Sequence, residues 1–361
     1  MLTKKLKKKI AIALSASVIA VTSSYAAVPV PQTEAFSWGN VVGAVIGGVV
    51  TSAQLNQEIK TYNNTEEGRQ AYFQAMKNQL GVNEDVELNA QLDTIMGNLT
   101  EAIGSVDPTI YDKPYNYFIN KDTSFNAFCT LGHNMSVNTG LFGLINNEDE
   151  IAVVLGHEMG HGQKDHPAKG AKQSIGPQIL ANATGNIAGV LVANLWNNQG
   201  ITKPMEWEAD NLAFEYITHS NYNPGATAAI WQRVMDRSTG GGNEFLQFLA
   251  GGPDHPSDKQ RRNNYLKKLK EYSNDHVEMD EGLIKVNGKD FATPAASNGM
   301  SAKERACFVL GNLAAAYHNG HDKGNVTVNG NVVMMGAQAI MESVEGDESA
   351  QVLADRLASI K

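Results

Sequence analysis

One helix-sized segment, residues 146–163, limits what this chain can fold into and what chemistry it can support. Two asparagines are suitable N-caps, three acidic residues suit the first turn, and an apolar run follows. The segment then carries the pattern His157-Glu158-Met-Gly-His161. Histidines four positions apart share a helical face and can bind one metal ion, while the glutamate can reach a water on that ion. Two surface histidines on an unrelated helix are the alternative interpretation.

A catalytic zinc site usually has three protein ligands, so a third ligand is expected elsewhere. We interpret His166 as a surface or turn residue outside the ligand set, because the segment lacks the spacing and the glycine that a third histidine ligand would need. Lys203-Pro204 opens another predicted helix, on which Glu206 and Asp210 share a face. That arrangement suits a ligand carboxylate and a second carboxylate that orients a ligand histidine. Two acidic residues in a solvated first turn are the alternative.

Together these motifs resemble peptidase family M48, a family of zinc metalloproteases, over about residues 50–270. Beyond the two helices, the resemblance is carried by the stretches at 126–128, 137–141 and 147–151. It implies one Zn²⁺ per chain, held by His157, His161 and Glu206. It also implies that Glu158 is catalytic, that Glu208 points away from the metal, and that Asp210 lies behind the ligands.

A later motif, His255-Pro256 with Arg261 six residues after the histidine, also resembles the family. His255 and Arg261 are therefore further catalytic candidates, because such a pair can stabilise the oxyanion that forms when water attacks a peptide carbonyl. Alternatively, the pair approaches the metal in a resting enzyme. The chain departs from the family's usual pattern at 129–133, where His133 is a further candidate polar group.

The predicted fold class is α+β: a mainly helical, zincin-like metalloprotease domain with a small β-sheet, plus a small C-terminal α+β appendage. Helical spacing predicts two or three helices across 54–104. Alternating apolar residues predict a strand at 115–119, and a second strand or pair is expected across 124–137. The segment 175–196 carries polar residues. They favour a soluble helix or helical hairpin, which we expect to cover the site.

The appendage, residues 281–361, lies outside the resemblance. Asn-Gly pairs follow the apolar segments 284–286 and 326–328, which is a strong hairpin signal. Helices are expected across 301–318 and 344–360. The sequence assigns no role to this part.

The first 26 residues have the order of a secretory signal peptide: lysines, an apolar run and small residues. A retained membrane anchor is the alternative, although the run is shorter than the roughly 20 residues that a span needs. The glycine-rich segment 38–53 either packs against the domain or lies in a membrane surface. We therefore expect a signal peptide at 1–26, a metallopeptidase domain at 27–280 and the appendage at 281–361.

The net charge of −9 becomes −14 once the five lysines of residues 1–26 are removed. Such an acidic chain has little affinity for nucleic acid or anionic lipid. Export makes the protein periplasmic or secreted and places it in an oxidising compartment. We therefore predict a disulfide between the only two cysteines, Cys129 and Cys307. Two buried, inert thiols are the alternative.

The function expected from the resemblance is a zinc-dependent endopeptidase of the cell envelope that degrades misfolded or unassembled proteins. An extended substrate would pair with the strand near 132–137. The expected partners are unfolded or misassembled polypeptides, and a peripheral membrane or envelope-complex association stays open. The alternative is a metal-containing chaperone or binding module with latent proteolytic activity. Glu158 argues against it, because hydrolysis needs this residue and zinc retention does not.

Overall fold

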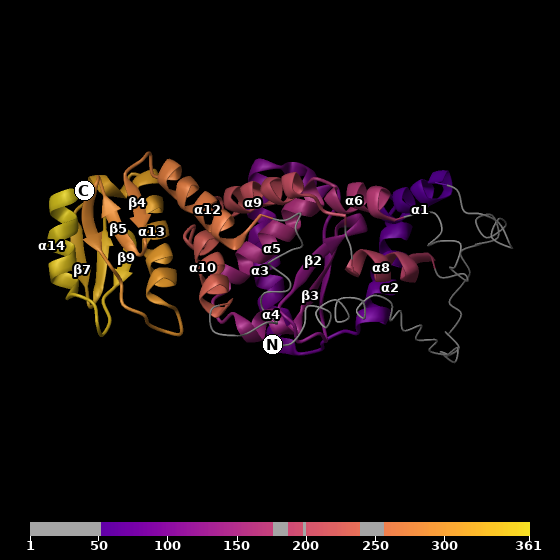
Figure 1. Cartoon of the computed structure of the whole chain (residues 1–361), viewed down its shortest axis with the longest axis horizontal. Coiled ribbons are helices and arrows are strands. Elements are labelled where there is room, and N and C mark those ends of the chain that lie inside the picture. Colours follow the sequence, from indigo (N-terminus) through magenta and orange to yellow (C-terminus); the bar gives the residue numbers. More distant parts are fainter. Residues whose placement is uncertain (1–51, 176–186, 198–199, 239–255) are drawn as a thin grey trace, which may run out of the picture. The chain divides into compact units, whose positions relative to one another are not determined.

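The structure is a computed structural model that describes residues 52–175, 187–197, 200–238 and 256–361 (Figure 1). The predicted signal peptide, nearly all of the apolar segment 38–53, and His255 lie outside these residues. What the sequence indicates about them stays a prediction.

The first described part of the chain forms three helices, as the helical spacing predicted. They are α1 (Ser52–Asn64), α2 (Glu66–Leu80) and α3 (Val86–Val106). Side-chain caps start the second and third helix: the Thr65 hydroxyl accepts from the amide of Gly68, and the Asp85 carboxylate accepts from two amides of α3. The buried residues of α1 and α2 belong to a small core, whereas those of α3 belong to the main core.

A three-stranded sheet follows, with β3 as its central strand. Its elements are η3 (Pro108–Tyr111), β1 (Asn116–Asn120), β2 (Ala127–Thr130), η4 (Leu131–His133) and β3 (Asn134–Asn138). β3 pairs with β1 in parallel and with β2 antiparallel. Because both edges of β3 are already paired, no further strand can join it. The predicted substrate pairing along 132–137 is therefore wrong, and β2 is the edge strand nearest the predicted metal helix.

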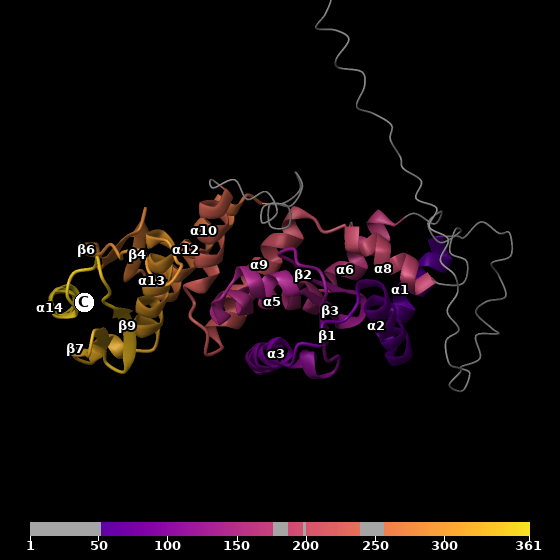
Figure 2. The ribbon, with the colours of Figure 1, turned by 90° about the horizontal axis from the view of Figure 1, so that it is seen from below.

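The helix that carries the His-Glu pattern forms as predicted, and close packing sets its position. The elements are α4 (Thr139–Leu144), α5 (Glu148–Gln163), α6 (His166–Ser174) and α9 (Lys203–Thr218). The Asn147 side chain caps α5. α5 lies between α9 and α3 and packs against β2 (Figure 2). Gly160 permits the close approach of α9, because a methyl group in its place would lie 3.3 Å from the carbonyl oxygen of Ala209.

The segment expected to cover the site is described only in part, as α8 (Ile187–Asn197). α8 packs chiefly against α2, and its buried Leu191, Val192 and Leu195 belong to the small core of α1 and α2. These contacts support a helix packed on α2 rather than one over the site. Within the four described ranges, none of the helices has the length and apolar character needed to cross a membrane.

The C-terminal part contains the same unit twice, a three-stranded antiparallel meander followed by a helix. After α10 (Ala226–Ser238) and α12 (Asp258–Tyr272), the first unit comprises β4 (Val277–Asp280), β5 (Leu283–Val286), β6 (Lys289–Ala292) and α13 (Ala302–His318). The second follows η5 (His321–Lys323) and comprises β7 (Val326–Asn329), β8 (Val332–Met335), β9 (Gln338–Glu342) and α14 (Ala350–Ile360). Val277 pairs with Val286 in one unit as Val326 pairs with Met335 in the other. Both middle strands carry a register shift at the same place.

Both Asn-Gly pairs lie in hairpin turns, as predicted. Asn287 and Gly288 have φ of 51° and 75°, the conformation that a two-residue hairpin loop requires. The expected domain boundary at residue 280 falls inside the β4–β5 hairpin, because these strands pair. The last helix begins at Ala350 rather than at 344, since a turn closed by Asp347 precedes it and Ser349 caps it.

A buried charge network joins α13 to α5 through α10. Arg233 of α10 donates to both carboxylate oxygens of Glu150 on α5, at 3.1 and 2.7 Å, and also pairs with Glu304 of α13. None of the three side chains is more than 4% exposed. Burial, reinforced by the nearby charge of Glu150, raises the pKa of Glu304 to about 7. Two carboxylates therefore share one guanidinium.

The predicted disulfide between Cys129 and Cys307 is wrong, because both residues are free, buried thiols. Cys129 lies on β2, where its amide faces Glu158 of α5. Cys307 lies on α13, where its carbonyl packs against Gly225 ahead of α10. Each cysteine is thus buried among different neighbours, as the alternative interpretation proposed.

Candidate metal centre

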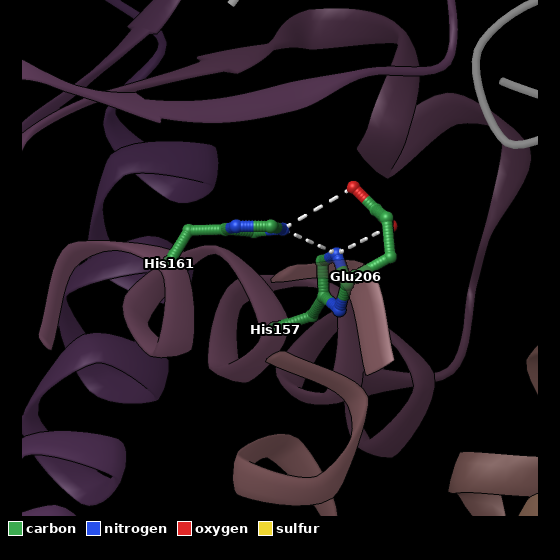
Figure 3. Close-up of side chains that lie close together, drawn as sticks. All are labelled: His157, His161 and Glu206. Carbon is green, nitrogen blue, oxygen red and sulfur yellow. Dashed lines mark hydrogen bonds and ion pairs between the residues drawn. The ribbon is translucent and has the colours of Figure 1, made fainter. Parts of the chain in front are cut away.

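Two histidines of α5 and a glutamate of α9 point toward one another (Figure 3). The Nε2 atoms of His157 and His161 are 3.0 Å apart. Oε2 of Glu206 lies 3.5 Å from Nε2 of His157, and Oε1 lies 3.5 Å from Nε2 of His161. The structure therefore brings together the three residues that the sequence proposed as metal ligands.

The spacing of these atoms fits a zinc ion. Zinc typically holds nitrogen and oxygen ligands in a tetrahedron at about 2.0–2.1 Å, which places the ligands about 3.3 Å from one another. The separations of 3.0 and 3.5 Å bracket that value. Two histidines and a glutamate are also a ligand set of catalytic zinc sites, in which a fourth position takes water. In the part of the chain that the structure describes, this is the one cluster of such side chains close enough to hold a metal ion.

The start of α9 explains why Glu206 reaches the histidines. Proline occupies the first turn of this helix, and Glu206 lies in the same turn. The positive end of the helix dipole favours a carboxylate there. The close α5–α9 packing at Gly160 then places this turn beside the two imidazoles.

Asp210 lies behind His157, on the side away from the other ligands. One carboxylate oxygen is 3.1 Å from Nδ1 of His157, and the Tyr265 hydroxyl donates to the same oxygen at 3.0 Å. Arg261 donates to both oxygens. Asp210 is completely buried. A hydrogen bond from Nδ1–H to this carboxylate leaves the lone pair of Nε2 for a metal ion, which is the orienting arrangement that the sequence proposed for Asp210.

Arg261 is bonded to carboxylates rather than directed at an open site. Its Nε donates to Asp210 at 2.7 Å, and Nη1 lies 3.5 Å from Glu206. The guanidinium carbon lies 3.7 Å from the centre of the Trp231 ring. These contacts favour a role in holding Asp210 and Glu206 over the predicted contact with an oxyanion. Its proposed partner, His255, lies outside the described residues.

Glu158 occupies a buried position beside the ligands. Its Oε2 accepts a hydrogen bond from the amide of Cys129 on β2, at 2.9 Å. Burial raises the pKa of Glu158 to about 7, although His157 and the Cys129 amide oppose the shift. A carboxylate with such a pKa can accept and release a proton near neutral pH.

The carboxylates around His157 favour the doubly protonated, positively charged form of its ring. Burial and Arg261 lower the pKa of His157, but Asp210 and Glu206 outweigh them and raise it to about 9. A histidine must lose the proton on its ligating nitrogen to bind a metal. Metal binding at this site is therefore expected to compete with protons and to weaken as the pH falls.

His166 is not the surface residue that the sequence predicted. Its side chain is 1% exposed, its Nδ1 lies 2.9 Å from Nδ1 of His161, and its Nε2 lies 3.0 Å from Glu208. The chain turns sharply between α5 and α6 because Asp165 adopts a left-handed conformation with φ of 51°. His166 lies outside the metal-ligand group, as predicted, but contacts a ligand from behind. The contact between His166 and Glu208 joins residues far apart in the sequence, and no local pattern indicated it.

His133 borders α5 without joining the metal-ligand group. Its ring stacks on Tyr115 with centroids 4.5 Å apart. Its two nitrogens contact the carbonyl oxygens of Lys113 at 2.7 Å and Gly162 at 3.1 Å. Burial lowers the pKa of His133 to about 4. These contacts join the end of α5 to the segment ahead of β1.

Comparison with known families agrees with this geometry. The model of peptidase family M48 matches residues 87–270, which is half of the chain. The chain belongs to peptidase family M48. The matched residues include α5 and α9, and therefore all three residues of the metal-ligand group.

Known relatives of this M48 chain include metalloproteases of bacteria and mitochondria. The beta-barrel assembly-enhancing protease of Yersinia pestis is 26% identical over 180 residues, which cover 43% of this chain and 35% of that protein. Metalloprotease LoiP of Escherichia coli is 24% identical over 173 residues, which cover 45% of this chain and 66% of that protein. The mitochondrial metalloendopeptidase OMA1 of Schizosaccharomyces pombe is 28% identical over 168 residues, which cover 45% of this chain and 47% of that protein. The chain thus spans between about a third and two thirds of the length of these relatives.

Proposed function

We propose that this M48 protein is a zinc-dependent endopeptidase of the cell envelope. The observation that carries the proposal is the position of Glu158, a buried carboxylate next in sequence to a metal-binding histidine and held by the amide of Cys129. Zinc retention does not require such a carboxylate, whereas hydrolysis does. Family membership and the names of the relatives support the same reaction class.

The residues present divide the work of hydrolysis between them. His157, His161 and Glu206 would hold the zinc ion, which when bound supplies Lewis acidity and lowers the pKa of water. Glu158 takes a proton from the attacking water and delivers it to the leaving amine nitrogen. The amide of Cys129 holds one oxygen of this carboxylate in place, so the proton moves on and off the other.

We infer that an extended substrate pairs with the outer edge of β2. The carbonyl of Asn126 accepts from the amide of Asn138, so residue 126 faces β3. The amide of Cys129 faces Glu158 instead, which places the odd-numbered residues of β2 with their backbone groups outward. Ala127 therefore turns its amide and carbonyl away from β3, although the residue is completely buried in this structure. Main-chain pairing of this kind suits substrates of varied sequence.

Misfolded or unassembled envelope proteins are the substrates that we propose. The lysine-rich and apolar order of residues 1–26 favours export to the periplasm or beyond. One bacterial relative is named for β-barrel assembly, which supports a place in envelope quality control. Unfolded chains also expose the extended backbone that pairing with β2 requires. Contact with a membrane surface or an envelope complex is part of the same proposal, through residues 38–53.

The Glu158→Gln variant separates this function from a metal-containing chaperone or binding module. Zinc content should be unchanged, while cleavage of casein should fall about 10²- to 10⁴-fold, the range for losing a general base. Glu215→Gln, an exposed change on α9, is the matched control. Zinc is measured by mass spectrometry of the metal, and cleavage by release of soluble peptides. Equal cleavage by the Glu158→Gln and wild-type proteins would contradict the mechanism.

A further inference from the structure

His161 is held from behind by a chain of polar side chains that the proposed mechanism does not use. Nδ1 of His161 lies 2.9 Å from Nδ1 of His166. Nε2 of His166 lies 3.0 Å from a carboxylate oxygen of Glu208. The side chains of His161 and His166 are 4% and 1% exposed, so water has little access to the first contact.

The positions of the protons along this chain follow from hydrogen-bond chemistry. When Nε2 of His161 binds a metal ion through its lone pair, Nδ1 of that ring carries the hydrogen and must donate it. Nδ1 of His166 is then the acceptor, which puts the hydrogen of His166 on Nε2. That hydrogen is donated to the carboxylate of Glu208. Each contact in the chain is satisfied by this single arrangement.

The helical geometry of α9 explains why His166 is needed. Glu206 and Asp210 are four residues apart and face the ligand histidines from one side of the helix. Glu208, two residues from each, leaves the helix in a different direction. His166, at the start of α6, spans the distance between Glu208 and His161. The acidic residues of 206–210 therefore each act on the metal centre: one directly, one through His157 and one through His166.

The geometry points to His166 and Glu208 as positioning residues that set the zinc affinity of the site. They hold His161 in the tautomer and ring orientation in which Nε2 faces the metal. Partners of this kind typically change metal affinity by about 10- to 100-fold. The inference rests on the proposed function only in taking zinc as the bound ion.

The test measures zinc affinity by competition with a chromophoric chelator, without any substrate. His166→Ala should weaken zinc binding about 10- to 100-fold. Glu208→Ala should weaken it less, because the Glu208 side chain is 49% exposed and solvent screens its charge. Glu215→Ala, an exposed change on the same helix, is the matched control and should bind zinc like the wild type.

A conservative variant distinguishes positioning from general loss of structure. In His166→Gln, the amide oxygen can accept from His161 and the amide nitrogen can donate to Glu208, so most of the zinc affinity should return. The visible spectrum of the Co²⁺-substituted protein should change in His166→Ala and return toward that of the wild type in His166→Gln. Far-ultraviolet circular dichroism confirms that each variant is folded.

Two results would overturn the inference. One is wild-type zinc affinity and an unchanged Co²⁺ spectrum in His166→Ala. The other is a His166→Gln protein that is folded but binds zinc as weakly as His166→Ala. Neither result depends on peptide cleavage, which the Glu158→Gln comparison tests separately. The inference and the proposed function can therefore fail independently.

Discussion

Removing the charge of Glu304 should stabilise the protein above neutral pH. Glu304 and Glu150 both pair with the guanidinium of Arg233, and all three groups are buried. Burial first, and then the charge of Glu150, raises the pKa of Glu304 from 4.5 to about 7. Glu304→Gln keeps an oxygen that can accept from the Ser301 amide in the capping box of α13, and it removes only the charge.

The sign and size of the effect follow from linkage between proton binding and folding. Between pH 4.5 and 7 the folded protein holds a proton on Glu304 that the unfolded chain has lost. This contribution to stability is complete below pH 4.5 and is lost as the pH rises through 7. A pKa of about 7 instead of 4.5 corresponds to about 3 kcal/mol in the free energy of unfolding. The free energy of unfolding of the variant, relative to that of the wild type, should therefore rise by up to that amount between pH 5 and pH 8.

Urea unfolding followed by circular dichroism at pH 5 and pH 8 measures this change. Glu345→Gln, an exposed substitution in the same part of the chain, is the control and should shift neither value. The difference between variant and wild type isolates Glu304 from other titrating groups. The quantity that decides is the free energy of unfolding of Glu304→Gln minus that of the wild type. If this difference falls between pH 5 and pH 8 instead of rising, the reasoning is refuted. Ionised Glu304 would then be a net stabilising partner of Arg233.

At the metal centre, Asp210→Asn should lower the melting temperature and the zinc affinity, because it removes the closer carboxylate partner of buried Arg261 and leaves only Glu206 at 3.5 Å, at a cost of up to about 3–5 kcal/mol. Thermal unfolding with and without zinc measures both effects, and an unchanged melting temperature contradicts the expectation. Gly160→Val should abolish zinc binding while α5 stays helical, because the new side chain would collide with Ala209 and displace α9. Full zinc content in that variant contradicts the packing argument. Chelation of the wild-type protein should abolish casein cleavage and reduce thermal stability, and stoichiometric zinc should restore both. Cleavage that persists after chelation would exclude metal-dependent hydrolysis.

The sequence alone determined the elements of the site whose causes are local. The cap at Asn147 and the apolar residues after it predicted α5, and the four-residue spacing placed His157 and His161 on one face. Pro204 and the acidic first turn predicted the helix that carries Glu206. The Asn-Gly pairs predicted two hairpins, because Asn287, Gly288 and Gly330 have the positive φ that such turns use and that glycine and asparagine adopt most easily. In each case the signal lies within a few residues of the feature that it predicts.

Only the tertiary structure decided which of these elements meet. β3 became the central strand because it pairs with β1 as well as β2, and this pairing leaves β1 and β2 as the edge strands of the sheet. His166 became buried because the turn at Asp165 directs it against α5 and α9, where it meets His161 and Glu208. Cys129 and Cys307 stayed apart because each packs among its own neighbours. Most of these contacts join residues tens of positions apart, and packing of whole elements sets them, so no local pattern in the sequence specifies them.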